Sequence, residues 1–583
     1  MFGFVRYSFM VVACLCAAVL GGERALGQVL QGEAAYGSWH DDKPGLRRLL
    51  TLQDLPPIDK PTYSLAQVGS IPTGARPQVP EGFSVELVTS ALRKPRVIRE
   101  APNGDLFVAD TMFNAVHVLR IPPGGAKPAR DEIFASGLKQ PFGVAFYPLG
   151  SDPRWVYIAN SDGVVRFRYR NGQLKATGKP ERIVAGIPTT HHYARDIAFS
   201  ADGRRLFFSV GSGSNAAQDM FPEPHLVMHP SPRIVGGIAE WSKTQPLGAA
   251  WDTEELRADV LSFDPDGTHM QIVATGLRNC EGMTVQPATG ELWCLVNERD
   301  ELGDNTPFEY ATHVIAGAFY GWPWYFIGGH EDPRHAGARP DLKDQVTVPD
   351  VLMQAHSAPL QMVFYQGDNF PPEYKGSAFV AMHGSWNRVK RTGYKVVRLL
   401  FDAEGKPTGE YEDFMTGFVL SDSQVWGRPV GVAVARDGSL IVTEDGNGTI
   451  WRVTYRGGTR AASGARRAVK AGYDPAKGGD LYIANCSACH LANGEGVPGA
   501  FPPLKGSGVV NKDYAANHIQ VVLNGMQGAR AGGVVYASAM PPFAGVLSDA
   551  EIADIIDYER SSWGNHGIPV NAAQVAAERA LPK

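Results

Sequence analysis

The chain has 583 residues, enough for about four domains of ~150 residues each. Gly and Pro, at 66 and 42 residues, are more frequent than average, and 44% of the residues are hydrophobic; this excludes a disordered chain and favours short strands joined by turns. The 55 basic and 60 acidic residues give a net charge of −5 with no block of like charge. This balance argues against a nucleic-acid-binding or membrane-surface protein.

Residues 1–27 have the pattern of an export signal. Arg6 supplies a positive charge, an apolar run from Phe9 to Leu20 follows, and an Ala-Leu-Gly cleavage site ends the segment. The run is shorter than the ~20 residues of a spanning helix, which favours a removed signal peptide over a retained anchor. A lipoprotein signal ending at Cys14 would have too short an apolar region. We therefore expect a periplasmic protein with no stable membrane span.

Residues 28–80 are rich in Pro and Gly and read as an extended N-terminal arm. Residues 81–456 repeat one pattern, in which a Gly turn precedes two short strands. Copies of the pattern contain strands near Leu106, Trp155, Leu206, Leu292, Ala378 and Leu440. One copy per ~60 residues fits a blade with long inserts, since kelch-type blades run near ~50 residues. We therefore predict an all-β six-bladed β-propeller, whose connecting loops gather at the ends of a central channel.

The composition and periodicity of the sequence change after the predicted propeller. Residues 457–472 have no apolar stripe and are rich in Gly, Ala and Arg, which indicates a linker. Helical periodicity follows, for example at Ile552 and Ile555. We predict a small all-α domain over residues 473–565 and a C-terminal tail over residues 566–583.

Two cysteines of the predicted propeller flank a predicted hairpin. Cys280 and Cys294 can form a disulfide if the chain is exported to an oxidising compartment. Two separate buried cysteines fit the sequence equally well, because the Cα separation that decides between them cannot be read from it.

The most specific motif is CxxCH at Cys486, Cys489 and His490. Two thiols three positions apart can add to the two vinyl groups of a haem, and the adjacent histidine then meets the iron. The alternative, a zinc or redox CxxC site, lacks a second pair of ligands nearby. The sequence predicts one covalently bound haem c with His490 as an axial ligand.

A second axial ligand is expected downstream. Met540, in a Met-Pro turn just before the last predicted helix, resembles the class I cytochrome c pattern, whereas Met526 is a rival. The resemblance covers residues 473–565. Ligation by histidine and methionine leaves no open coordination position, so the resemblance implies a domain that transfers electrons.

The predicted propeller contains no GxGxxG opening a βα unit, which argues against nicotinamide or flavin binding. Seven of its segments together resemble the glucose/sorbosone dehydrogenase family, whose propeller enzymes use pyrroloquinoline quinone (PQQ) and calcium. With the fused cytochrome, the chain looks most similar to the L-sorbosone dehydrogenase-like branch. The segments are HHYARD (191–196), GLRN (276–279), NERDELGD (297–304), FYGWP (319–323), HSAP (356–359), HGSWNR (383–388) and WGRP (426–429).

The resemblance implies four PQQ contacts. Arg278 and Arg428 match family positions that bind the cofactor, with Asn279 as a neighbour, and Arg binds the carboxylates of the quinone in a bidentate manner. Arg388 lies where the family has a basic contact, although the spacing around it differs. For each arginine, a surface ion pair is the alternative.

The resemblance also implies a general base. His192 matches the family's base, which takes a proton from a sugar hydroxyl. His191 would point the other way on a strand, and His356 and His383 are rival bases. Arg195 either steadies developing negative charge or supports the strand.

Calcium is the third cofactor that the resemblance implies. Its ligands in the family are largely main-chain carbonyls of the turn that matches Asp300 and Glu301, and a solvated acidic turn is the alternative. Aromatic side chains that could present a flat surface to a sugar, or simply lie in the core, are Tyr320, Trp322, Trp324 and Trp386.

These features together predict a quinohaemoprotein dehydrogenase acting on an aldose or a sugar aldehyde. His192 removes the proton, PQQ takes the hydride, and the haem passes single electrons to a soluble cytochrome or a respiratory-chain acceptor. A calcium-dependent lactone hydrolase on the same propeller is one alternative, although it would not need the haem. A non-enzymatic electron-transfer or sugar-binding propeller is the other.

Overall fold

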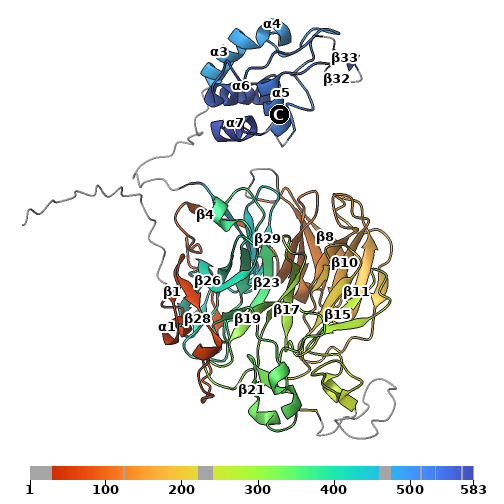
Figure 1. Cartoon of the computed structure of the whole chain (residues 1–583), viewed down its shortest axis with the longest axis vertical. Helices are drawn as coiled ribbons and strands as arrows, with labels where there is room; N and C mark the ends of the chain where they lie inside the picture. Colours follow the sequence, from red (N-terminus) through yellow and green to blue (C-terminus); the bar gives the residue numbers. More distant parts are fainter. Residues whose placement is uncertain are drawn as a thin grey trace, which may run out of the picture. The chain divides into compact units, whose positions relative to one another are not determined.

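The computed structural model describes residues 29–122, 125, 127–220, 241–457, 475–512, 515–528, 530–531, 534–536, 538–565, 567 and 569–581. The chain divides into two compact units, Met1–Arg460 and Ala461–Lys583 (Figure 1). The predicted signal peptide lies outside the described residues, as does the predicted linker beyond Gly457. Across the described ranges, none of the helices has the length and apolar character needed to span a membrane.

The first unit is mostly β, as predicted. In its described residues, six sheets share one plan, in which four antiparallel strands lie side by side. The first three sheets contain β5 (Pro95–Glu100), β6 (Leu106–Asp110), β7 (Ala115–Arg120) and β8 (Arg130–Ser136); β9 (Val144–Tyr147), β10 (Trp155–Asn160), β11 (Gly163–Arg168) and β12 (Glu181–Val184); and β13 (Ile197–Phe199), β14 (Leu206–Val210), β15 (Asp259–Phe263) and β16 (Gln271–Ala274).

The other three sheets follow the same plan. They contain β17 (Cys280–Val285), β18 (Leu292–Val296), β19 (Glu309–His313) and β22 (Val351–Met353); β23 (Pro359–Phe364), β24 (Ala378–Met382), β25 (Lys395–Phe401) and β26 (Pro407–Met415); and β29 (Pro429–Val434), β30 (Leu440–Glu444), β31 (Thr449–Tyr455) and β4 (Phe83–Thr89). Because β4 precedes all the others in sequence, the last sheet joins the two ends of the repeat.

The first strands of the six sheets contact one another in turn. Contacts run from β5 through β9, β13, β17 and β23 to β29, and β29 contacts β5 again. Within each sheet, the start of the first strand lies beside the end of the second, as in the pairing of Pro95 with Asp110. The loops before every first strand and after every second strand therefore lie at the same end of their sheets, which we call the first-strand end.

Many strands are buried along their whole length. Every residue of β6, β15, β18, β24 and β30 is buried, because each sheet packs against neighbours on both of its faces. This explains why these segments are apolar runs in the sequence rather than alternating patterns.

The predicted N-terminal arm is attached to the fifth sheet. After β1 (Val29–Leu30) and α1 (Glu33–Tyr36), β2 (Arg47–Leu49) pairs with β26. Arg48 there lies 2.7 Å from both Asp42 and Asp413, and Lys395 lies within 2.8 Å of the same two carboxylates. All four side chains are at most 7% exposed, so the arm is held by a buried ionic cluster.

Shorter elements lie between and beside the sheets. β3 (Gln67–Val68), also from the arm, pairs with β28 (Gln424–Val425), which pairs with β27 (Val419–Ser421). β20 (Tyr325–Phe326) and β21 (His330–Glu331) form a separate pair. The short 3₁₀ helices are η1 (Leu52–Asp54), η2 (Thr111–Phe113), η3 (Asp252–Glu254), η4 (Pro333–His335), η5 (Pro340–Gln345) and η6 (Pro372–Tyr374).

The second unit is mostly helical. It contains α3 (Pro475–Asn485), α4 (Ser487–His490), α5 (Ala516–Asn524), α6 (Asp549–Ser561) and α7 (Ala572–Arg579). Ser548 begins α6 with a capping box to Glu551, as the acidic first turn suggests. A short hairpin of β32 (Arg530–Ala531) and β33 (Val534–Val535) means that the unit is not purely α. The tail predicted from residue 566 includes α7, which packs on α5 and α6.

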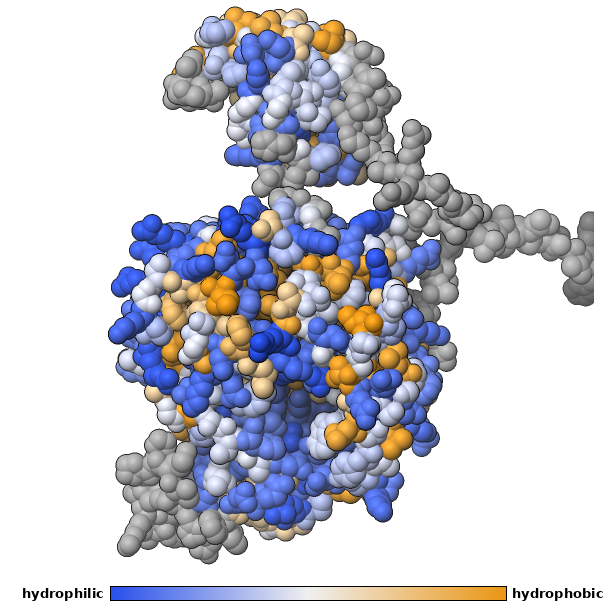
Figure 2. Space-filling view, turned by 180° about the vertical axis from the view of Figure 1, so that it is seen from behind, coloured by the Kyte–Doolittle hydropathy of each residue, from blue (hydrophilic) through white to orange (hydrophobic). Residues whose placement is uncertain are grey.

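On the side of the molecule shown in Figure 2, hydrophobic residues of the first unit are scattered among polar ones. This is the usual surface of a water-exposed protein.

Candidate functional site

His192 lies at the first-strand end, in the loop before β13. Its Nδ1 is 3.0 Å from both the carbonyl oxygen and the hydroxyl of Ser212, which follows β14. Because a carbonyl oxygen only accepts, Nδ1 carries the hydrogen and Nε2 keeps its lone pair. Burial, and then the positive charge of Arg278, hold the pKa of His192 well below its usual value. His192 is therefore a neutral base at pH 7.

His191 and His192 lie in a loop rather than on a strand. Their rings are 4.3 Å apart and nearly perpendicular, and His191 is exposed with a φ of 59°. The rival base His356 is only 5% exposed; its Nε2 contacts the Gly303 carbonyl oxygen and its Nδ1 contacts Asn387. With both ring nitrogens engaged, His356 has none left to accept a substrate proton.

Arg195 is completely buried. Its guanidinium donates to the carbonyl oxygens of His192, Ala194 and Pro188 at 2.6–2.8 Å. Of the two roles that the sequence left open, this geometry favours support of the loop that carries His192. It does not favour direct contact with developing charge.

Arg278 and Asn279 directly precede β17. Arg278 is 3% exposed and donates to the carbonyl oxygens of Asn215, Asn297 and Glu298 at 2.8–3.0 Å, so it is not in a surface ion pair. Asn279 donates to Glu281 at 2.9 Å. The side-chain oxygen of Asn279 has no hydrogen-bond partner within the described part of the chain and is a free acceptor.

Arg428 belongs to a cationic cluster around Asp445 at the same end of the sheets. Arg428 Nη2, His383 Nε2 and Arg96 Nη1 lie 2.9, 3.0 and 3.2 Å from the Asp445 carboxylate. Burial alone would raise the pKa of Asp445, but the neighbouring His383, Arg96 and Arg428 outweigh it and hold the pKa below the usual range. Two arginines share one carboxylate, which leaves positive charge for an anionic group.

Arg388 lies beside the N-terminal arm. Its Nη2 is 3.4 Å from the Gly37 carbonyl oxygen, and burial lowers its pKa to about 10. The side chain is 2% exposed, and Nε and Nη1 have no partner among the described residues. Arg388 thus lies at the first-strand end, and its side chain contacts the N-terminal arm.

The predicted calcium residues are already engaged in part. The Asp300 carboxylate contacts Asn387 and Arg278, and its carbonyl oxygen accepts from Asn215 and Arg299. Glu301 is exposed with a φ of 76°. In the ranges that the structure covers, no group of three or more His, Cys, Asp or Glu side chains could hold a metal ion. Since the expected ligands are largely main-chain carbonyls, calcium stays a prediction.

Of the four aromatic residues that could face a sugar or lie in the core, three are core residues. Tyr320, Trp322 and Trp324 are at most 2% exposed, whereas Trp386 is 48% exposed. The Trp386 ring lies 6.4 Å from the ring of Tyr63 in the N-terminal arm, which is 54% exposed. Asn387, next to Trp386, joins the polar network at Asp300.

Sequence reasoning missed Arg96, Ser212 and Asp445. No motif marks them, yet each lies at the start of a first strand or just after a second strand. That position was the signal that could have found them, because the loops there lie at the same end of the sheets.

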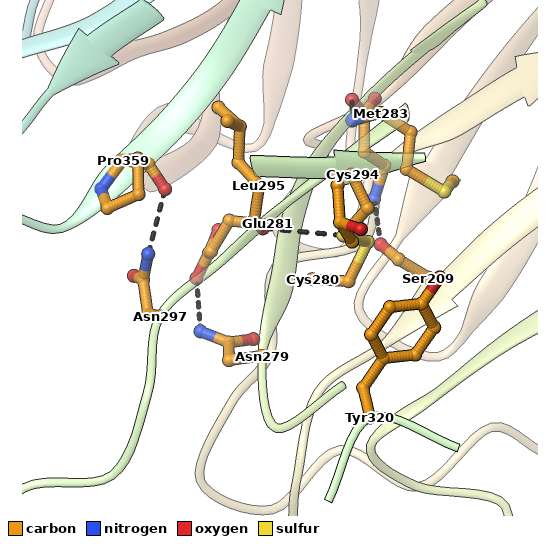
Figure 3. The surroundings of a disulfide bond; sticks show 12 residues. Ser209, Asn279, Cys280, Glu281, Met283, Cys294, Leu295, Asn297, Tyr320 and Pro359 are labelled. Carbon is orange, nitrogen blue, oxygen red and sulfur yellow. Dashed lines mark hydrogen bonds between the residues drawn. A yellow bond between two sulfur atoms is a disulfide. The ribbon is translucent and has the colours of Figure 1, made fainter. Parts of the chain in front are cut away.

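Cys280 and Cys294 form a disulfide with a Cα separation of 5.8 Å (Figure 3), which settles the alternative left open by the sequence. The bond joins β17 to β18 directly beside Asn279 and Glu281. A register shift between Cys280 and Gly282 also lies here, so the cross-link fixes the irregular start of β17.

Replacing Cys280 and Cys294 together by alanine should lower the free energy of unfolding of the first unit by about 3 kcal/mol, the value for a closed loop of ~15 residues. The measurement is denaturant unfolding followed by tryptophan fluorescence. The matched control is the same pair of proteins under reducing conditions, where the difference should vanish. A double variant as stable as the oxidised wild type would contradict the prediction.

The second unit contains a cavity of about 480 Å³ at the CxxCH motif. Cys486, Cys489, His490, Met526 and Met540 all line it. His490 Nδ1 lies 2.9 Å from the Pro502 carbonyl oxygen, so Nδ1 carries the hydrogen and Nε2 is free to bind a metal. The structure thus brings together all residues predicted to hold the haem, including both methionine candidates.

The two methionines differ in their packing. Their main chains form an isolated bridge. Met540 packs against the apolar core of α5 and α6, whereas Met526 is 42% exposed. Met540 is therefore the better-anchored candidate.

Met540→Ala should lower the reduction potential of the haem by removing a methionine ligand, whereas Met526→Ala should leave it near the wild-type value. Spectroelectrochemical titration of the purified protein measures both. The opposite pattern would assign the ligand to Met526.

Comparison with known proteins adds the family. Residues 77–224 and 339–456 match the TrAA12-like family, and residues 474–558 match the family of cbb3-type cytochrome c oxidase subunit III. The chain thus contains a TrAA12-like domain and a C-terminal cytochrome c domain. The predicted resemblance to PQQ-dependent sugar dehydrogenases fused to a cytochrome c is thereby confirmed.

Individual relatives agree with both parts. A PQQ-dependent pyranose dehydrogenase of Coprinopsis cinerea is 23% identical over 430 residues, covering 65% of this chain and 55% of its own length. The cytochrome c subunit of a quinone-dependent alcohol dehydrogenase of Gluconobacter oxydans is 39% identical over 89 residues, covering 15% of this chain and 19% of its own length. The chain thus spans about half the length of the first relative and about one fifth of the length of the second.

The fold of the TrAA12-like domain also agrees with a solved structure. The PQQ domain of the Coprinopsis cinerea pyranose dehydrogenase superimposes with a TM-score of 0.51 at 22% identity, over 67% of this chain and all of that domain. Within the TrAA12-like domain, His192, Arg388 and Arg428 lie in the matched ranges, whereas Arg278 and Asp300 lie between them.

Proposed function

We propose that this protein is a periplasmic quinohaemoprotein dehydrogenase that oxidises an aldose or a sugar aldehyde, with sorbosone-like compounds as first candidates. The six sheets would be the blades of a propeller. One observation carries the proposal: a neutral histidine with a free Nε2, His192, lies at the same end of the sheets as the cationic residues around Arg428. The pattern of residues 1–27 supports export to the periplasm.

The unpaired arginine nitrogens at the first-strand end fit an anionic quinone, whereas the unpaired oxygens there fit donor groups of a ligand or water. Buried polar atoms without a partner gather at the first-strand end; they are Asn279 Oδ1, Glu281 Oε2, Asn387 Oδ1, Arg388 Nε and Nη1, and Arg428 Nε. Such atoms cost free energy unless a ligand or water meets them. Arg388 and Arg428 would hold the carboxylates and carbonyls of PQQ, and Asn279 Oδ1 would accept from an N–H of the cofactor. Arg278 would contribute through its positive charge. When bound, PQQ supplies the hydride acceptor.

The chain's own residues prepare the substrate. His192 Nε2 takes the proton of the hydroxyl on the carbon that is oxidised, because the Ser212 carbonyl keeps the hydrogen on Nδ1. Trp386 and Tyr63 present exposed aromatic faces to the sugar at the edge of the same network. A calcium ion on the main-chain oxygens of Asp300 and Glu301 is part of the proposal; it would have to displace Asn215 and Arg299 from the Asp300 oxygen, and no step above depends on it.

The cytochrome c domain would carry the electrons onward. Cys486 and Cys489 would hold one haem covalently, and His490 and Met540 would bind its iron. The external acceptor would be a soluble cytochrome or a respiratory-chain component. The presence of a cytochrome c domain argues against a lactone hydrolase, because hydrolysis releases no electrons.

The test is the visible spectrum of the purified protein with oxidised haem. The protein is incubated with calcium, with or without PQQ, and spectra are recorded before and after addition of aldoses and sugar aldehydes. Haem reduction only with both PQQ and a sugar is the expected result. Reduction by dithionite but by no PQQ–sugar pair, together with failure to bind PQQ in calorimetry, would contradict the proposal. Lactone hydrolysis without haem reduction would favour the hydrolase.

A further inference from the structure

The loop that carries His192 is held by two side chains of the segment between β14 and β15. Glu254 is the last residue of η3 and Arg257 follows it by three positions. Both are 1% exposed, and both lie outside the ranges that match the TrAA12-like family.

Arg257 joins the two segments that make up the site of the base. On the segment before β13, it donates to the Thr190 hydroxyl at 2.8 Å and to the carbonyl oxygens of Thr190 and His192 at 2.6 and 3.2 Å. On the segment after β14, it donates to the carbonyl oxygens of Gly211 and Ser212 at 2.9 and 2.8 Å. One guanidinium thus fixes the distance between His192 and Ser212.

Glu254 holds the turn after Ser212. Its carboxylate accepts from the Gly213 main-chain nitrogen at 2.5 Å and from the Ser214 hydroxyl at 2.6 Å. The Ser212 hydroxyl in turn donates to the Ser214 carbonyl oxygen at 2.7 Å. These bonds direct the Ser212 carbonyl toward His192 Nδ1.

We propose that Arg257 and Glu254 are positioning residues for the base His192, which they act on through the Ser212 carbonyl oxygen. This rests on the proposed function. The Ser212 carbonyl accepts from both His192 Nδ1 and Arg257 Nη2. It therefore keeps the hydrogen of His192 on Nδ1, while the positive charge of Arg257 opposes protonation of Nε2.

The electrostatics of the loop agree with this geometry. Burial, then Arg278, His191 and Arg257, lower the pKa of His192, and the Ser212 carbonyl acts in the opposite direction. The charged and titratable groups around His192 are Arg195, Arg257, Arg278, His191 and, behind Arg257, Glu254. Arg257 is the member of this set that also fixes the loop.

Arg257→Met and Arg257→Lys separate the positioning of His192 from the effect of the positive charge on its pKa. Arg257→Met should lower kcat/KM about 100-fold, because a misplacement of ~1 Å costs that much, and should move the acid limb of the pH profile to higher pH. Arg257→Lys keeps the charge but loses the planar set of donors, so kcat/KM should fall while the acid limb stays in place.

A second readout does not need the enzymatic reaction. Diethyl pyrocarbonate acylates neutral imidazole, and peptide mass spectrometry reports the rate at His192 as a function of pH. Arg257→Met should raise the pH at which His192 becomes reactive, and Arg257→Lys should not. The exposed His40 in the same samples is the internal control.

Arg205→Met is the matched control variant. Arg205 also donates to a hydroxyl and a carbonyl, those of Ser262 and His269, but at the opposite end of the same sheet. It should change neither readout. If Arg257→Met folds with both pH dependences unchanged, Arg257 is only structural and the proposal is wrong. If wild-type protein shows no PQQ-dependent sugar oxidation, the proposed function fails, while the modification rates still test the effect of Arg257 on His192.

Discussion

Replacing His192 with alanine should lower kcat/KM for sugar oxidation about 10²–10⁴-fold, the usual contribution of a general base. The reason is the geometry of the loop, in which Ser212 holds the hydrogen on Nδ1 and leaves Nε2 as the proton acceptor. Haem reduction in single-turnover mixing with PQQ and sugar measures the loss. Dithionite should still reduce the haem fully, which shows that the cytochrome c domain is intact.

The pH dependence of kcat/KM should show the direction in which the pKa of His192 is shifted. Because burial and Arg278 lower the pKa of His192, the residue stays unprotonated below the ordinary histidine value of ~6.5. In wild-type protein, kcat/KM should therefore persist below that pH and fall only when His192 becomes protonated. In His192→Ala this acid limb should disappear.

His191→Asn is the matched control, since asparagine tolerates the positive φ of this exposed neighbour. It should keep kcat/KM within a few-fold of wild type. A large loss in His191→Asn with little loss in His192→Ala would assign the base to His191.

Replacing Arg48 with methionine should lower the free energy of unfolding of the first unit by about 3–5 kcal/mol, because it leaves buried carboxylates without their partner. Arg48 is 0% exposed and bridges Asp42 of the arm and Asp413 of β26, with Lys395 as the remaining cation. Denaturant unfolding monitored by tryptophan fluorescence measures the change. The N-terminal arm should also become sensitive to limited proteolysis.

Arg47→Met on the same strand is the control. Arg47 pairs with Glu410 at 2.5 Å, but both side chains are about one-fifth exposed, so the loss should be at most about 1 kcal/mol. Equal losses in the two variants would mean that the buried cluster does not anchor the arm.

Much of the organisation of this protein follows from local patterns. The apolar runs of β6, β18 and β30 predicted strands, and the CxxCH motif predicted that Cys486, Cys489 and His490 form one site, where they line one cavity. The assignment of His192 came from a motif of consecutive residues. Each of these signals is local, because a strand, a short helix or a covalent attachment site is specified by neighbouring residues.

Roles that depend on a distant partner were left open or missed. Arg195 and Trp322 have residue types that suit a site, but both are buried, and only the packing of the loops shows this. Asp445 and Arg257 carry no motif, and their importance arises from contacts with residues tens or hundreds of positions away. The disulfide was left open for the same reason.

The sequence by itself predicted the family, the β-rich domain with its repeated strands, the cytochrome c domain and His192 as the candidate base. The tertiary structure decided which arginines meet one another, which aromatic ring is exposed and how the base is held neutral. The physical reason is that motifs record covalent neighbours, whereas burial, charge and hydrogen bonding at the first-strand end are set by loops that only the packed sheets bring to the same place.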